Sequence, residues 1–151
     1  MITITPDKPS YAAGETVLAK ITLSLGKATK ARSLVATLSC TERHRVTEQK
    51  IMDKYDFDRE KEMGGFKETH MYTTTSEHSS ALFSEKKEIS GAKEYSSGEF
   101  SVSFAIPARG PPTSHEFGHD SKIHIWKLSA KLDIPFALDE NAEKEIFVEG
   151  L

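Results

Sequence analysis

Three histidines and an aspartate lie close together in the sequence and carry side chains that suit a metal ion. They are His115, His119, Asp120 and His124. A catalytic zinc needs three such ligands and one open position. However, the His115-x-x-x-His119 spacing brings both rings to one face only on a helix, and Pro111-Pro112 just upstream predicts a loop. We therefore expect no metal and no cofactor here. A metal-dependent enzyme that uses His115, His119 and His124 is kept as an alternative.

Other residues capable of chemistry fit structural roles better. Cys40 is the only cysteine and falls on the inward-facing parity of an alternating segment, where a thiol acts as a small apolar group. The chain has no Gly-x-Ser-x-Gly elbow and no Gly-rich phosphate loop. An acidic run contains interspersed basic residues and lacks the glycine of an EF-hand, so it predicts a solvated charged face. Its acids are Asp53, Asp56, Asp58, Glu60 and Glu62. We expect a protein that is not an enzyme.

Composition limits the classes of partner. The chain has 151 residues and a formal net charge of -3, which gives no basic surface for nucleic acid. No apolar run approaches the roughly 20 residues that cross a bilayer, and the first residues lack the features of a signal peptide. We therefore expect one domain over residues 1–151 that is cytoplasmic, binds no nucleic acid and does not insert into a membrane.

The elements that position these residues are predicted to be strands. Residues 16–25, 33–40, 100–106 and 126–134 each alternate apolar and polar side chains, which is typical of strands with one face on a core. Ile123 and Ile125 lie in the opposite phase to the last stripe, which indicates either a bulge or burial of both faces. The aromatic residues on these stripes are expected in the core, with Trp126 between the sheets. They are Phe100, Phe104, Trp126 and Phe136.

Shorter strands at residues 2–5, 81–89 and 145–148 complete a set of seven. Glu42–Ser80 is charged and alternates only weakly, so it is either a strand pair with a crossover or a long loop. We expect strands within it, because a structureless loop of that length is unusual in a compact domain. A helix of one or two turns is predicted at residues 58–63, where helix formers precede Gly64-Gly65.

Two motifs lie in order along the chain. The segment DKPSYAAGETV, from Asp7 to Val17, follows the first short strand. The segment GEFSVSFAIP, residues 98–107, is followed by PPTS at residues 111–114. Together they resemble the arrestin-like family, which includes arrestins, the cargo-binding subunit of retromer and bacterial sporulation-control proteins. Family members with trafficking roles usually carry two sandwiches, whereas this chain holds one, and it lacks the Pro-Pro-x-Tyr motif that recruits a ubiquitin ligase.

The resemblance also implies a binding surface. In arrestins, basic residues near the first strands engage phosphorylated partners, and this chain has a comparable group there. The group is Lys8, Tyr11, Lys20, Lys27, Lys30 and Arg32. The competing interpretation is that these lysines only solubilise an edge strand.

The sequence thus predicts an all-β, immunoglobulin-like (arrestin-type) β-sandwich of two antiparallel sheets with about seven or more strands. The function that follows is a non-catalytic adaptor or scaffold that binds partner proteins through a sheet edge or loops. Membrane-protein tails and trafficking components are the partners implied, and a homodimer through the same edge stays open. A carbohydrate-binding or adhesion module is a further alternative, which requires exposed aromatic side chains on one face.

Overall fold

The computed structural model describes residues 1–51, 71–115 and 122–150, and all of the regular structure in these ranges is β-strand. The side chains of residues 47–51 and 71–75 are outside the description. The strands are β1 (Ile2–Pro6), β2 (Tyr11–Ala12), β3 (Thr16–Leu23), β4 (Thr29–Ala31), β5 (Ser33–Ile51), β6 (Met71–Ser90), β7 (Lys93–Tyr95), β8 (Gly98–Ala105), β9 (Lys122–Asp133), β10 (Glu140–Ile146) and β11 (Val148–Glu149).

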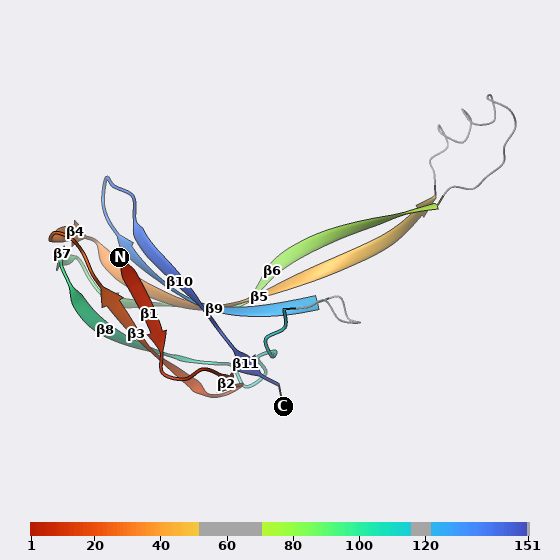
Figure 1. The fold of residues 1–151 in the computed structure, drawn as a ribbon, viewed down its shortest axis with the longest axis horizontal. Coiled ribbons are helices and arrows are strands. Elements are labelled where there is room, and N and C mark those ends of the chain that lie inside the picture. Colours follow the sequence, from red (N-terminus) through yellow and green to blue (C-terminus); the bar gives the residue numbers. More distant parts are fainter. Residues whose placement is uncertain (52–70, 116–121, 151) are drawn as a thin grey trace, which may run out of the picture.

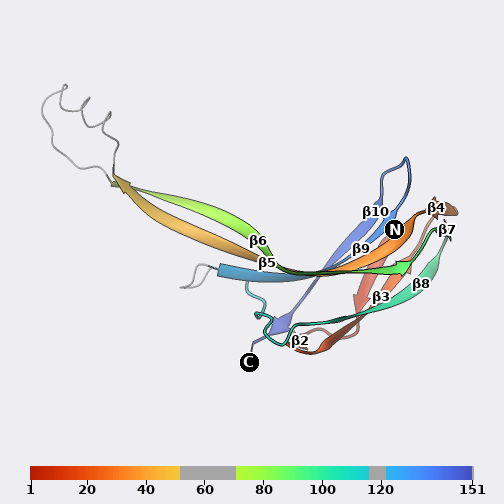
Figure 2. The same cartoon turned by 180° about the vertical axis from the view of Figure 1, so that it is seen from behind.

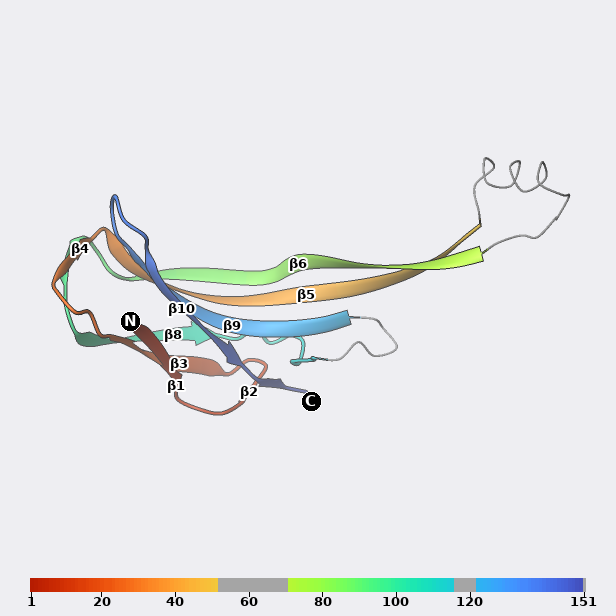
Figure 3. The same ribbon diagram turned by 45° about the horizontal axis from the view of Figure 1, so that its top comes forward.

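Two antiparallel sheets form the layers of a sandwich. One sheet has the strand order β1-β3-β8, and the other has the order β10-β9-β5-β6. Figure 3 shows the first sheet lying beneath the second, with β8 under the β6 side and β1 near β10. Two small pairs, β2 with β11 and β4 with β7, lie at opposite ends of the sandwich (Figure 1). The predicted all-β sandwich of two antiparallel sheets is confirmed.

The core fills the space between the two sheets. The even-numbered residues of β9 from Trp126 to Leu132 and those of β5 from Leu34 to Cys40 are buried, as the alternation predicts. Trp126 has no exposed surface, and its indole N–H donates to the carbonyl oxygen of Pro111 at 2.8 Å. The expectation that Trp126 packs between the sheets is therefore confirmed.

The phase change in β9 comes from burial on both faces. The pairing of β9 with β5 runs without a register shift from Ser33 opposite Asp133 to His44 opposite Lys122, so β9 has no bulge in this pairing. Ile123 is buried on the face opposite to Trp126. Of the two explanations that the sequence allowed, the structure supports the second.

Phe136 corrects one expectation. The sequence places it in the core, but its side chain is fully exposed in the connection between β9 and β10. Its φ is 60°, in the left-handed region that non-glycine residues rarely adopt. Leu138 in the same connection is also exposed. Apolar character alone predicted the core position, whereas the turn directs the ring into solvent.

The segment Glu42–Ser80 does contain strands, as predicted. β5 continues to Ile51, and β6 begins at Met71, so the two strands form a hairpin much longer than the sandwich (Figures 1 and 2). We call the part of this hairpin beyond the end of β9, residues 45–51 and 71–77, the arm. The helix expected at residues 58–63 and the acidic run at residues 53–62 lie outside the described residues.

Candidate functional site

The outer side of β6 is the longest strand edge in the described part of the chain. β6 has 20 residues and forms the end of the order β10-β9-β5-β6, so only its β5 side is paired there. The other outer strands, β1, β8 and β10, have 5, 8 and 7 residues. An unpaired strand edge presents N–H and C=O groups that another chain can bind. We call this side of β6 the β6 edge.

The nearby edge of β8 is covered at one point by a lysine of β6. Lys87 donates from its ammonium group to the backbone carbonyl oxygen of Ser103 at 2.5 Å. The same ammonium group lies 5.1 Å from the centre of the Phe104 ring, within the range of a cation–π contact. Lysine on a sheet edge blocks the approach of a further strand. The β8 edge is therefore covered at this point by Lys87, whereas no described strand pairs with the β6 edge.

A β-bulge divides the β6 edge into two halves. Cys40 pairs with Phe83 and Thr41 pairs with Ala81, so Leu82 is an extra residue on β6. A bulge of this kind changes which residues of a strand face the core. Phe83 faces inward and its ring lies 5.9 Å from that of Trp126, whereas Leu82 keeps 49% of its surface exposed.

Arg45, Ser76 and Glu77, at the end of the arm next to the sandwich, are exposed. The pairing of β5 with β9 ends at His44, while the pairing with β6 continues to Ile51 opposite Met71. Arg45 and Glu77, which face each other across the arm, form an ion pair of 3.5 Å. No sequence pattern marked the arm as strand over its full length, because its residues show no regular alternation of apolar and polar side chains.

The basic group expected to bind partners is split by the fold. Lys27, Lys30 and Arg32 are exposed at the end of the sandwich that carries β4 (Figure 1). Lys20 is exposed on β3 and lies 3.7 Å from Glu99 of β8. Lys8 lies at the opposite end, beside β2. Six residues near each other in sequence order therefore do not form one continuous surface.

Tyr11, the aromatic member of that group, is buried, and its hydroxyl takes part in a partly buried hydrogen-bond network. Its hydroxyl donates to Asp7 Oδ1 at 2.6 Å and accepts from the Lys8 backbone N–H at 3.1 Å. Only 1% of its surface is exposed. Burial and the Asp7 bond raise the pKa of Tyr11 to about 12, and the same bond lowers the pKa of Asp7. The Lys8 ammonium group is paired with Glu15 at 2.8 Å. These contacts fix the β1–β2 turn.

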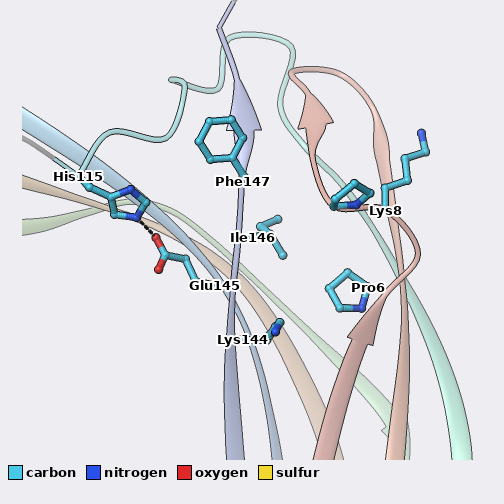
Figure 4. A pocket seen from close by; sticks show the side chains of 8 residues that line it. Pro6, Lys8, His115, Lys144, Glu145, Ile146 and Phe147 are labelled. Atoms are coloured by element: carbon cyan, nitrogen blue, oxygen red, sulfur yellow. Dashed lines mark hydrogen bonds and ion pairs between the residues drawn. The ribbon is translucent and has the colours of Figure 1, made fainter.

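A shallow hollow of about 370 Å³ lies between that turn and β10 (Figure 4). Pro6, Ile146 and Phe147 give it apolar walls, and Lys8 lines it from the turn. His115 reaches Glu145 of β10 beside it, as the dashed line in Figure 4 marks. The structure thus brings together Lys8 and His115, which the sequence assigned to different candidate sites.

The histidines do not gather into a metal site in the described residues. His115 contacts Glu145 on β10, whereas His124 contacts Glu42 on β5 at 3.0 Å, so the two rings are engaged by different carboxylates. Among residues 1–51, 71–115 and 122–150, no three His, Cys, Asp or Glu side chains converge as metal ligands do. His119 and Asp120 lie outside the described residues.

Cys40 lies in the core, as its parity predicted. It has no exposed surface. Burial, with a smaller effect from the Glu42 charge, raises the pKa of its thiol to about 11. A thiol of this kind stays protonated at neutral pH and is a poor nucleophile.

Comparison with known proteins shows the fold alone. No protein-family model matches the sequence, and no curated protein matches it. The structure is similar to the crystal structure of Spo0M, a sporulation control protein from Bacillus subtilis, with a TM-score of 0.60 and 20% sequence identity. The likeness covers 99% of this chain and 49% of that chain, so this chain spans about half the length of Spo0M. The resemblance to sporulation-control proteins is thereby confirmed at the level of fold.

Within the described residues, no helix is long and apolar enough to cross a membrane.

Proposed function

We propose that residues 1–151 act as one non-catalytic protein-interaction domain, of the adaptor or scaffold kind, that binds an extended segment of a partner protein along the β6 edge. The observation that carries this proposal is the 20-residue outer strand, which is paired on one side only in the described part of the sheet. The bound segment would become the fifth strand next to β6.

Strand addition accounts for both affinity and selectivity. Backbone N–H and C=O groups on the β6 edge provide the ladder, and side chains on alternate positions select the sequence that binds. The exposed Leu82 and the charged residues on both sides of it offer an apolar contact flanked by charge. The β8 edge is less available to a partner segment, because the Lys87 ammonium group already donates a hydrogen bond to the carbonyl oxygen of Ser103.

The partner class follows from the arrestin-like resemblance. We propose cytoplasmic tails of membrane proteins or trafficking components as partners, and the cytoplasm as the location. Lys27, Lys30 and Arg32, at one end of the sandwich, are exposed and suit a second contact with acidic or phosphorylated residues. Spo0M is named a sporulation control protein, and a regulatory role fits a domain that binds other proteins.

Proline substitutions on β6 test the proposal. Successive residues of a strand direct their N–H groups to opposite sides, so Ser79→Pro and Ser80→Pro differ in which ladder they disturb. One removes an N–H from the β6 edge and keeps the pairing with β5, and its melting temperature should stay close to that of the wild type. The other removes a bond to β5 and should melt at a lower temperature.

The two variants are compared with the wild type in affinity capture from a lysate of the cells that express the protein, followed by mass spectrometry. We expect the wild type to retain a reproducible partner that the thermally intact proline variant loses. Asn141→Lys on β10, at the other edge of the same sheet, is the control and should retain it. Equal capture by the wild type and the intact β6 variant would contradict the proposal.

A further inference from the structure

We infer that a second copy of this chain binds the β6 edge, so that two sheets join into one continuous eight-stranded sheet. The inference rests on the proposed function, because it uses the same edge and names its occupant. The two β6 strands would run antiparallel about a two-fold axis that passes between Ala81 and Leu82. Such an interface is formed by the same residues on both copies.

The bulge at Leu82 decides which residues can face each other across this axis. On one side of the bulge, Glu77 lies opposite Arg45 and shares the solvent face with it. On the other side, Lys86 lies opposite Thr37 on that same face. Residues opposite each other in an antiparallel pair point to the same face. The extra residue therefore lets Glu77 of one copy face Lys86 of the other.

The core-side face shows the same match. His78 pairs with His44, and Glu85 pairs with the buried Leu38, so both lie on the inward-directed face of β6. The two-fold axis that joins Glu77 to Lys86 also places His78 opposite Glu85 of the other copy. A neutral or a protonated imidazole can donate a hydrogen bond to a carboxylate. Symmetry doubles each contact, which gives two ion pairs and two histidine–carboxylate pairs.

Neighbouring registers lose this complementarity. A shift must move the pairing by two residues to keep the faces matched. One such shift places Glu77 opposite Ser84 and forms no charge pair. The shift in the other direction places Glu77 opposite Glu88, where two like charges repel. Charge therefore favours the axis between Ala81 and Leu82 over both alternatives.

The axis also lies at the apolar residue that the edge exposes. Leu82 has 49% of its surface exposed in the single chain. In the paired arrangement it faces Ala81 of the other copy, and both copies of Leu82 lie next to the axis. Because residues 76 and 77 belong to the arm and residues 85–87 lie over the sandwich, each arm would extend alongside the sandwich of the other copy.

Charge reversal tests the register, and the probe is the full chain itself. The single variants Glu77→Lys and Lys86→Glu each place like charges opposite each other at two symmetric positions. The double variant restores opposite charges with the polarity exchanged. Leu82→Asp places two carboxylates beside the axis. The single chain should tolerate this substitution, because the side chain of Leu82 is half-exposed. Lys127→Glu, on β9 and away from the edge, is the matched control.

Sedimentation velocity over a concentration series measures the dimer. We expect the wild type and Lys127→Glu to dimerise with the same affinity. Each single reversal should weaken dimerisation by roughly 10- to 100-fold, as two lost attractions and two new repulsions imply, and the double variant should regain most of the affinity. Leu82→Asp should be monomeric. Circular dichroism spectra should stay those of the wild type throughout.

A wild type that stays monomeric at every concentration would overturn this inference, and so would a dimer that none of the three edge variants weakens. The proposed function is tested separately, by capture of a different protein. A monomeric wild type that still loses its captured partner with the thermally intact proline variant would overturn the dimer and leave the proposed function standing. A dimer that the reversals weaken, without capture of another protein, would support the inference and count against the adaptor.

Discussion

Alkylation of Cys40 provides a direct test of the packing that places β6 beside the core. This residue is the only cysteine in the chain, so a thiol reagent gives a single signal. It lies opposite Phe83 of β6 and Trp126 of β9, and it has no exposed surface. Access to its sulfur therefore requires the packing around it, which includes β6 and β9, to open.

The expected protection follows from the pKa and from burial. Burial raises the pKa of the thiol from 9.0 to about 11. At pH 8 the reactive thiolate fraction falls from about 10% to about 0.1%, which is a decrease of about 100-fold. Exclusion of the reagent from the core lowers the rate further, because reaction then requires local opening.

The assay compares the rate of alkylation by iodoacetamide at pH 8 in native buffer and in concentrated urea. We expect the native rate to be at least about 100-fold lower than the rate in urea. Cys40→Ala combined with Ser101→Cys moves the thiol to an exposed position on β8 and should remove the protection. A native Cys40 that reacts within a few-fold of its rate in urea would refute the placement of β6 on the core.

Three further substitutions test other parts of the structure. Trp126→Ala should lower the free energy of unfolding by about 3–5 kcal/mol in urea denaturation, and a loss below about 1 kcal/mol would contradict its central packing. Phe136→Asn should raise the free energy of unfolding by about 0.5–1 kcal/mol, because asparagine tolerates the left-handed φ and the exposed ring packs on nothing; a lower melting temperature would contradict this. Tyr11→Phe should change the acid dependence of stability. The Tyr11 hydroxyl lowers the folded-state pKa of Asp7 below 3.8, so this stabilisation is complete above that pH and is lost as the pH falls through the lowered value. The variant should show a smaller loss of stability in acid, and an unchanged acid profile in thermal unfolding below pH 4 would contradict the assignment.

The sandwich strands were predictable because one face of each packs on a single core. In β3, Val17, Ala19, Ile21 and Leu23 are buried, and the polar residues between them are not, which is the pattern that the sequence displays. The sequence marks such strands through their period of two. Leu18 is the one apolar residue on the polar side of this stripe, and it is exposed in the structure.

The full length of β6 could not be predicted from the sequence, and the reason is physical. Its first residues, MYTTTSE at positions 71–77, belong to the arm and show no regular apolar period to be detected. The bulge at Leu82 then shifts the period of the remaining residues. Pairing with β5 determines this strand, and such non-local pairing leaves a weak local signal.

The candidate partner-binding group stays a prediction, but the structure separates its members. The basic group was chosen by its order in the sequence, but the fold places Lys8 and Lys30 at opposite ends of the sandwich. Tyr11 was named as a binding residue, whereas its hydroxyl is engaged by Asp7 inside the β1–β2 turn. Motif membership alone did not reveal that Tyr11 helps to build this turn.

Amide hydrogen exchange along β6 and β10, followed residue by residue by NMR, tests the central claim most directly. In the free monomer at low concentration, the amides of β6 that point away from β5 should exchange quickly. In the assembled state, whether with a second copy or with a captured partner, alternate amides between residues 76 and 87 should become protected, while the outer amides of β10 stay unchanged. Rapid exchange of the outer β6 amides in the assembled state, or protection of β10 instead, would contradict binding along the β6 edge.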